Sequence, residues 1–145
     1  IEGPAHFNTR ERFLRKVYEV LKPGGVLLLL DIIVDNRVIY RNWLNRRIGK
    51  FCSKHWCMPE KNWMSIDELK SLLESIGFRR LSVNSIGEHV YPGFSRFNLK
   101  WKSFINAVRI RGLRLGIGLT FISWLLGFTY RMGMTDYAII RAVRE

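Results

Sequence analysis

Acidic residues are missing from two long stretches of this chain of 145 residues. No Asp or Glu lies between Asp35 and Glu60, or between Glu88 and Asp136, although both stretches carry Lys and Arg and many aromatic residues. The formal net charge is +12. Such an imbalance indicates an anionic partner. An anionic membrane surface is expected first, nucleic acid is the competing partner, and a solvated basic face balanced by an acidic missing half of the protein is the third interpretation.

Cysteine is scarce, with Cys52 and Cys57 alone. Two cysteines do not form the disulfide framework of a small secreted protein, so the expected compartment is reducing. We therefore expect a cytoplasmic protein, with peripheral membrane attachment as an open alternative. Cys52, His55 and Cys57 are close in sequence, but zinc normally takes four ligands and the chain offers no second pair. No metal site is predicted.

Long hydrophobic runs are also missing. The longest uncharged segment, residues 115–130, is bracketed by arginines and is shorter than the roughly 20 apolar residues that span a bilayer. A helix buried in a cap over a ligand site is favoured for this segment. An in-plane membrane helix and a short span remain as alternatives. The segment has three glycines, which would allow close packing against other helices. They are Gly116, Gly118 and Gly127.

The clearest pattern in the sequence surrounds the turn Lys22-Pro23-Gly24-Gly25. Before it, apolar residues recur at helical spacing over residues 13–21, while Arg10 is expected on the solvent face. Pro23 and the glycines end that helix. The apolar run after the turn does not alternate, which is typical of a strand covered on both faces of a parallel-type sheet. This strand ends on Asp31, at the edge where open α/β sheets bind ligands.

The other expected elements follow from capping residues and hydrophobic periodicity. They are an N-cap at Asn8, a basic helical insertion over 36–63, a helix over 65–76 capped by Ser65 and Glu68 and stopped by Gly77, a strand over 81–86, one helix over 94–108, another over 115–130, and a closing strand over 136–143.

Several of these pieces, in this order, resemble the class I S-adenosylmethionine-dependent methyltransferases. They are the run from His6 to Leu14, the turn over 22–25 and the strand residues 29–32, and the small-molecule and lipid-modifying branch is the most similar. The resemblance covers about residues 1–33 and 62–86 and the last strand. It implies an α/β fold with a Rossmann-like sheet of seven strands.

In that fold this chain would supply the carboxy-terminal strands and helices. Insertions at 36–63 and 88–135 would form a cap that faces the substrate or a membrane. The family's glycine-rich turn after the first strand has no counterpart in this sequence. The resemblance therefore also implies a partner, the amino-terminal half of the same domain, without which the chain is expected to be inactive.

The resemblance implies S-adenosylmethionine as cofactor and methyl transfer to a hydrophobic small molecule or lipid. A basic, aromatic and apolar cap suits such an acceptor. A nucleic-acid methyltransferase is one alternative, because the same cations would bind phosphates. A non-catalytic membrane-interaction module is another.

Candidate site residues follow from the same resemblance. His6 is expected to act as the catalytic base or to orient the acceptor; alternatively it only hydrogen-bonds its loop. Glu2, in the same loop, is the candidate cofactor-binding residue. The candidate lining of the substrate pocket is Asp31, Tyr40, Trp43, His89 and Tyr91. Alternatively, Asp31 caps the following turn, the two aromatic residues of the first insertion are core residues, and the two residues after the strand pack within their loop.

Overall fold

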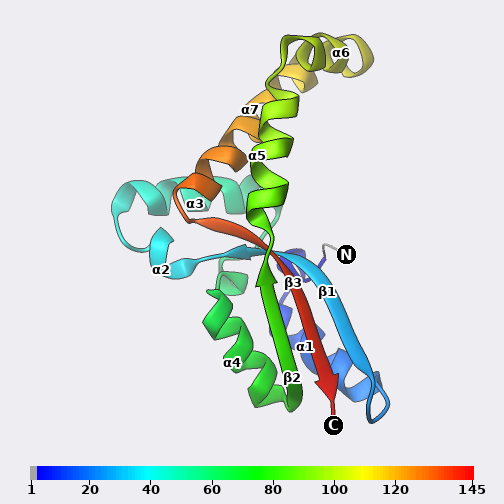
Figure 1. Ribbon diagram of the computed structural model, residues 1–145. Coiled ribbons are helices and arrows are strands. Elements are labelled where there is room, and N and C mark those ends of the chain that lie inside the picture. Colours follow the sequence, from blue (N-terminus) through cyan, green and yellow to red (C-terminus); the bar gives the residue numbers. More distant parts are fainter. Residues whose placement is uncertain (1–2) are drawn as a thin grey trace.

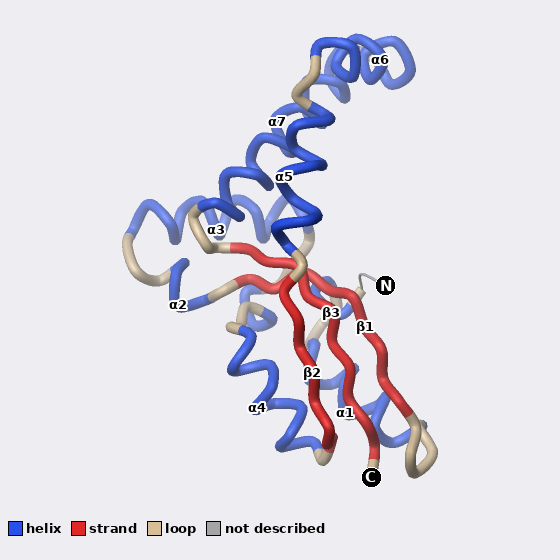
Figure 2. Tube along the Cα trace, in the orientation of Figure 1, coloured by secondary structure: helices blue, strands red, loops and turns tan. Residues whose placement is uncertain are grey.

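The computed structural model describes residues 3–145. Its centre is a sheet of β1 (Val26–Val34), β2 (Phe78–Ser85) and β3 (Thr135–Arg144), in the order β1-β3-β2 (Figures 1 and 2). β3 is antiparallel to both neighbours, so β1 and β2 run in the same direction with the last strand between them. The carboxyl ends of β1 and β2 therefore meet at one edge of the sheet. The expected α/β fold is confirmed.

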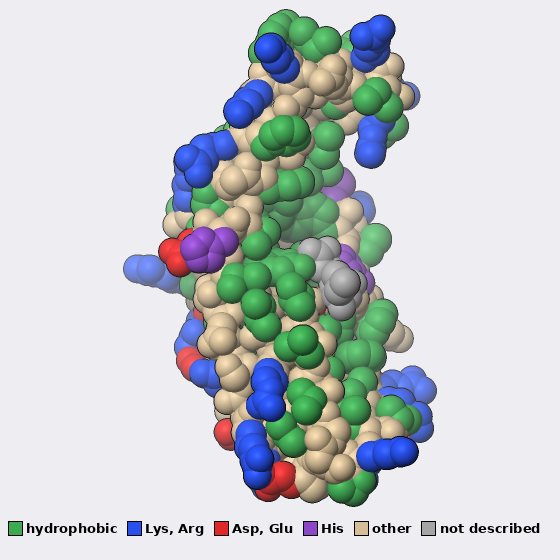
Figure 3. Space-filling view, turned by 45° about the vertical axis from the view of Figure 1, so that its right-hand side comes forward, with side chains coloured by type: hydrophobic (Ala, Val, Ile, Leu, Met, Phe, Trp, Pro, Cys, Tyr) green, Lys and Arg blue, Asp and Glu red, His purple; other side chains and the backbone are tan. Residues whose placement is uncertain are grey.

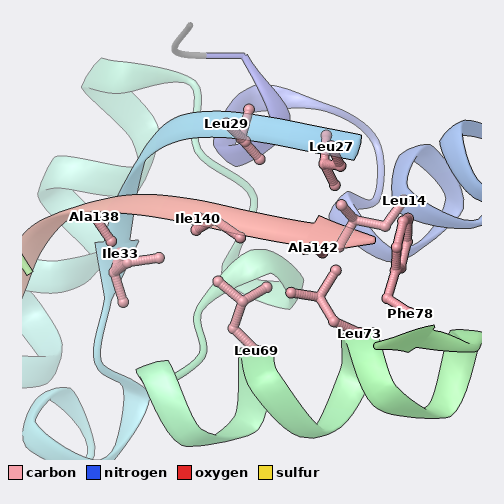
Figure 4. Close-up of a cluster of buried hydrophobic side chains, with 10 residues drawn as sticks. All are labelled: Leu14, Leu27, Leu29, Ile33, Leu69, Leu73, Phe78, Ala138, Ile140 and Ala142. Atoms are coloured by element: carbon pink, nitrogen blue, oxygen red, sulfur yellow. The ribbon is translucent and has the colours of Figure 1, made fainter. Parts of the chain in front are cut away.

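Two helices, α1 (Arg10–Val20) and α4 (Ile66–Ile76), cover one face of this sheet. Leu14 of α1 and Leu73 of α4 are at most 1% exposed and pack against the strands (Figure 4). The capping box of Ser65 and Glu68 begins α4, and left-handed Gly77 ends it, as expected. The remaining side chains of this core are Leu27, Leu29, Ile33, Leu69, Phe78, Ala138, Ile140 and Ala142.

The opposite face of β1 is only partly covered. Its exposure alternates, and Val26 and Leu28 are 47% and 63% exposed. The expectation of a strand covered on both faces is therefore wrong for the part of the chain that the structure describes. Within that part β1 pairs with β3 alone, which leaves its other edge without a neighbouring strand.

The turn after α1 is held by the last strand. Gly24 has a φ of +78°, as expected, and its N–H donates to the carbonyl of Arg144 at 2.7 Å. The Arg144 guanidinium donates to the carbonyls of Tyr18 and Glu19 and lies 4.9 Å from the centre of the Tyr18 ring. A cation at a helix carboxyl end satisfies unpaired carbonyls and the helix dipole. One residue of β3 thus caps the first helix.

Two of the differences between the predicted and the observed element boundaries have a local cause. Thr9 caps α1 in place of Asn8, because its hydroxyl accepts from the N–H of Arg12. β2 begins three residues early, since a bulge with Arg80 at a φ of +51° interrupts the alternation between Arg79 and Ser82.

The predicted insertions form helices beyond the carboxyl ends of β1 and β2 (Figure 1). The first holds α2 (Asn36–Ile39), α3 (Trp43–Trp56) and the short η2 (Glu60–Asn62). The second holds α5 (Gly87–Asn98), α6 (Trp101–Arg111) and α7 (Leu113–Arg131), which we call the arm. A single helix over 94–108 is wrong, because Lys100 has an extended backbone that separates α5 from α6.

Glycines mark the close contacts of α7 within the arm. A Cβ at Gly127 would lie 2.6 Å from the Ser95 hydroxyl of α5, and one at Gly116 would lie 2.5 Å from a methyl of Val108 in α6. A Cβ at Gly118 would have nothing within 4 Å. The expected close packing is confirmed at the first two positions.

Gly127→Leu is expected to lower the free energy of unfolding by about 1–3 kcal/mol, because the new side chain overlaps α5. Gly118→Leu is the matched control and is expected to leave stability unchanged or higher, since leucine favours the helix. Urea unfolding followed by circular dichroism checks both. Equal losses for the two variants would show that the α5–α7 contact does not depend on a glycine.

Candidate functional site

An apolar groove lies between α3 and α7, beyond the carboxyl ends of β1 and β2. Its volume is about 490 Å³. Each helix contributes four side chains at the spacing of one helical face. The rings of Phe51 and Phe121 meet edge-on across it, with centroids 6.2 Å apart, and Arg47 is the one charged residue of the lining. The lining is Leu44, Arg47, Ile48, Phe51, Phe121, Trp124, Leu125 and Phe128.

A second hollow of about 230 Å³ lies on the other side of α7, where α5 meets the end of the sheet. We call it the sheet-end pocket. Figure 3 shows hydrophobic side chains gathered where the arm joins the rest of the molecule. The lining of the pocket is Ile32, Val90, Tyr91, Phe94, Leu126 and Tyr137. α7 is thus a wall of both apolar spaces.

His6 ends the short helix η1 (Pro4–His6) and is exposed. Its Nδ1 lies 2.9 Å from the backbone carbonyl of Trp56, at the end of α3. A carbonyl only accepts hydrogen bonds, so Nδ1 carries the proton in this contact and Nε2 of a neutral ring keeps a free lone pair. The geometry fits both alternatives for His6, since the ring fixes its loop and still presents a basic nitrogen.

Asn62 is a positioning residue that the sequence did not indicate. It is 3% exposed, and its amide group donates to the carbonyls of Ala5 and Phe7 at 3.0 and 2.7 Å. Its side-chain oxygen accepts from the N–H of Arg10 at 2.8 Å. One buried amide therefore ties the loop of His6 to the start of α1. Sequence offers little signal for such a residue, because its partners lie more than 50 positions away.

Asp31 is buried, with 0% exposure, and it lines neither the groove between α3 and α7 nor the sheet-end pocket. Its carboxylate lies 3.1 Å from Nη2 of Arg10, which is 1% exposed and also donates to the carbonyl of Ile32 at 2.7 Å. Burial raises the pKa of Asp31, and the Arg10 guanidinium opposes that rise. The expectation that Arg10 faces solvent is wrong, since it forms a buried ion pair between α1 and β1.

Tyr40 and Trp43 lie on the outer surface of the first insertion and are 52% and 69% exposed. Arg46 lies 5.7 Å from the centre of the Tyr40 ring, and Arg47 lies 5.8 Å from that of Trp43. Neither aromatic residue lines the groove between α3 and α7 or the sheet-end pocket. Their role in a substrate pocket stays a prediction.

The two candidates after β2 differ in their surroundings. His89 is exposed and lies 3.3 Å from Glu88. Tyr91 is 3% exposed, lines the sheet-end pocket and donates its hydroxyl to the carbonyl of Asp136 at 3.1 Å. Its ring stacks on Tyr130 with centroids 5.2 Å apart. The structure therefore brings Tyr91, but not His89, to an apolar cavity.

The described residues do not form a cradle for the cofactor that the fold family implies. The turn with Gly24 and Gly25 precedes β1 and so lies at the amino edge of the sheet. At the carboxyl edge, a Cβ at Gly87 would lie 2.3 Å from a carboxylate oxygen of Asp136, so protein already fills the space beside this glycine. Glu2, the candidate cofactor-binding residue, lies outside the described residues.

Cys52, His55 and Cys57 do not form a cluster of metal ligands. Cys52 is buried, which raises the pKa of its thiol to about 12, whereas Cys57 is exposed. His55 bonds the carbonyl of Phe51 in its own helix. Within residues 3–145, no three His, Cys, Asp or Glu side chains are grouped as metal ligands.

Comparison with known proteins points to one class. The chain is 28% identical over 144 residues to an O-methyltransferase of Penicillium expansum, and 26% identical over 127 residues to the sterol 24-C-methyltransferase of Kluyveromyces lactis. These alignments cover 99% and 83% of this chain, but 46% and 33% of the relatives. The chain thus spans less than half of the curated relatives. No protein-family model matches it.

Solved structures show the same fold. Phosphoethanolamine N-methyltransferase 2 of Haemonchus contortus, in complex with phosphomonomethylethanolamine and S-adenosylhomocysteine, has a TM-score of 0.79 at 12% identity. The cyclopropane synthase MmaA2 of Mycobacterium tuberculosis has a TM-score of 0.74 at 18% identity. The matches cover 99% of this chain, and 32% and 53% of those chains.

In sequence and in fold, the chain is similar to part of the domain of class I S-adenosylmethionine-dependent methyltransferases. The resemblance to these enzymes that the sequence predicted is confirmed, and the relatives fit the branch that modifies small molecules and lipids.

Proposed function

We propose that the protein containing this chain transfers a methyl group from S-adenosylmethionine to a hydrophobic small molecule or lipid. We further propose that it does so at an anionic membrane surface. The similarity to O-methyltransferases and to a sterol methyltransferase supports the reaction class. The remainder of the domain would bind the cofactor, which supplies an electrophilic methyl group, and would pair with the free edge of β1.

The groove between α3 and α7 is the observation that supports a hydrophobic acceptor. Its lining has seven apolar side chains and one cation, Arg47, beyond the sheet edge at which α/β folds bind ligands. Such a lining excludes water from an apolar body and leaves one place for an anionic or polar head. In this proposal, residues 36–63 and 88–135 form the cap over the acceptor, and Arg47 orients its polar end.

Leu44→Glu tests this assignment in the full-length protein. Leu44 lines the groove and is 52% exposed, so a carboxylate there leaves the core intact but opposes an apolar ligand. We expect the KM for a hydrophobic hydroxylated acceptor to rise about tenfold or more, with S-adenosylmethionine affinity unchanged. Val20→Glu is the matched control, because Val20 is an exposed apolar residue of α1 outside the groove.

The assay follows transfer of labelled methyl from S-adenosylmethionine to a panel of sterols, prenylated phenols and fatty acids. An unchanged KM in Leu44→Glu would place the acceptor elsewhere. Methyl transfer to RNA or DNA with no transfer to the panel would replace this proposal by the nucleic-acid alternative.

A further inference from the structure

The far end of the arm exposes large apolar side chains. α6 has no buried residue, and Trp101 and Ile110 at its two ends are 71% and 79% exposed. Leu113 and Leu115 continue this exposure into α7, at 59% and 63%. Figure 1 shows α6 at the tip of the arm, away from the sheet. Large apolar residues exposed at a projecting tip indicate a docking surface.

The same tip is strongly basic. Lys102 and Arg109, seven residues apart, lie on one outward face of α6 and are exposed. No Asp or Glu occurs between Glu88 and Asp136. The basic residues of this interval are Arg96, Lys100, Lys102, Arg109, Arg111, Arg114 and Arg131. A partner that covers the tip must therefore bury apolar groups and carry negative charge.

We infer that α6 and its turn into α7 dock the protein on an anionic lipid bilayer. This inference rests on the proposed function and deepens it, because it names the docking element and the partner. A bilayer with anionic headgroups neutralises the cations and accepts Trp101 and Ile110 into its interface. Nucleic acid would bind the cations and stack on Trp101, but offers no comparable burial for aliphatic Ile110 and Leu113.

α7 links this tip to the groove. Ile117, Phe121, Trp124 and Phe128 share one face of the helix, and consecutive rings from Phe121 onward lie 6.0 and 5.5 Å apart between centroids. The stripe gives an apolar acceptor a continuous path from the bilayer to the groove between α3 and α7.

A transmembrane position for α7 is disfavoured. With 19 residues it is long and apolar enough to cross a membrane by length and composition. However, its carboxyl half buries Ser123, Leu125, Gly127 and Thr129 within the protein. In this inference α7 does not cross the membrane, and only its amino-terminal end contacts the bilayer surface.

Vesicle co-sedimentation of the full-length protein tests the docking. The vesicles are pure phosphatidylcholine, or phosphatidylcholine with phosphatidylserine, without any acceptor. We expect binding to the anionic vesicles, weaker binding to the neutral ones, and a decline with salt. Lys102→Glu with Arg109→Glu is expected to lower the partition coefficient at least about 25-fold, because each lost cation weakens binding about fivefold. Trp101→Ala with Ile110→Ala is expected to lower it about tenfold.

The matched control is Arg12→Glu with Lys22→Glu. It changes the net charge equally, on exposed residues of α1 and its turn. Equal losses in tip and control variants would reduce the effect to net charge and overturn the assignment. Binding to an oligonucleotide but not to vesicles would also overturn it. Methyl transfer to a soluble acceptor is measured separately, so failure of docking is distinguishable from failure of the proposed reaction.

Discussion

Arg10→Met is expected to lower the free energy of unfolding by about 3–5 kcal/mol, because it leaves the carboxylate of Asp31 buried without its cation. Arg10 and Asp31 are 1% and 0% exposed, and no water can replace the lost partner easily. The same change removes the hydrogen bond from Arg10 to the carbonyl of Ile32. Urea unfolding of the full-length protein measures the loss.

Two variants separate the buried pair from a general loss of charge. Arg10→Met combined with Asp31→Leu is expected to regain most of the stability, since an apolar pair of similar volume avoids burying any charge. Arg15→Met breaks an ion pair with Glu11 whose side chains are 53% and 50% exposed, and should cost at most about 1 kcal/mol. If the double variant were as unstable as Arg10→Met, the loss would come from the side-chain packing of Arg10.

Local signals in the sequence were sufficient for the framework of the fold. Pro23 and Gly24 end a helix by their own backbone chemistry, and Ser65 with Glu68 caps one within four residues. Gly77 stops that helix for the same local reason. These positions are predictable because each depends on neighbours in the chain.

Features that depend on distant partners could not be predicted. Arg10 occupies a place in the helical pattern that would suit solvent, and only Asp31, on a strand 21 residues later, makes it a buried residue. Asn62 has a positioning role only because its amide donates to loop carbonyls that are distant in sequence. The groove needs α3 and α7 side by side, although 56 residues separate the two helices.

Composition predicted the nature of the insertions but not their shape. Their basic and aromatic character is evident in the sequence, whereas the break at Lys100 between α5 and α6 and the close approach of α6 to α7 at Gly116 are not. The exposed stripe on α7 likewise depends on which face meets α5.

His6→Asn is expected to reduce the rate of methyl transfer to a hydroxylated acceptor by about 10²–10⁴, because the resemblance implies that His6 takes the proton of the acceptor. An asparagine amide can still donate a hydrogen bond to the carbonyl of Trp56, so the loop keeps the contact that Nδ1 makes. The variant lacks a basic nitrogen in the place of Nε2. Steady-state kinetics in the full-length protein should show a fall in kcat with little change in acceptor KM.

His6→Ala supplies the decisive comparison, because it removes both the base and the loop contact. If His6 acts as a base, Asn and Ala variants lose activity to a similar extent. If it only fixes the loop, the Asn variant keeps the activity and the Ala variant loses it. His89→Asn, at an exposed histidine after β2, should leave the rate unchanged in either case. Because Nδ1 contacts the carbonyl of Trp56, the ring can serve both roles only through different nitrogens, and these variants separate them.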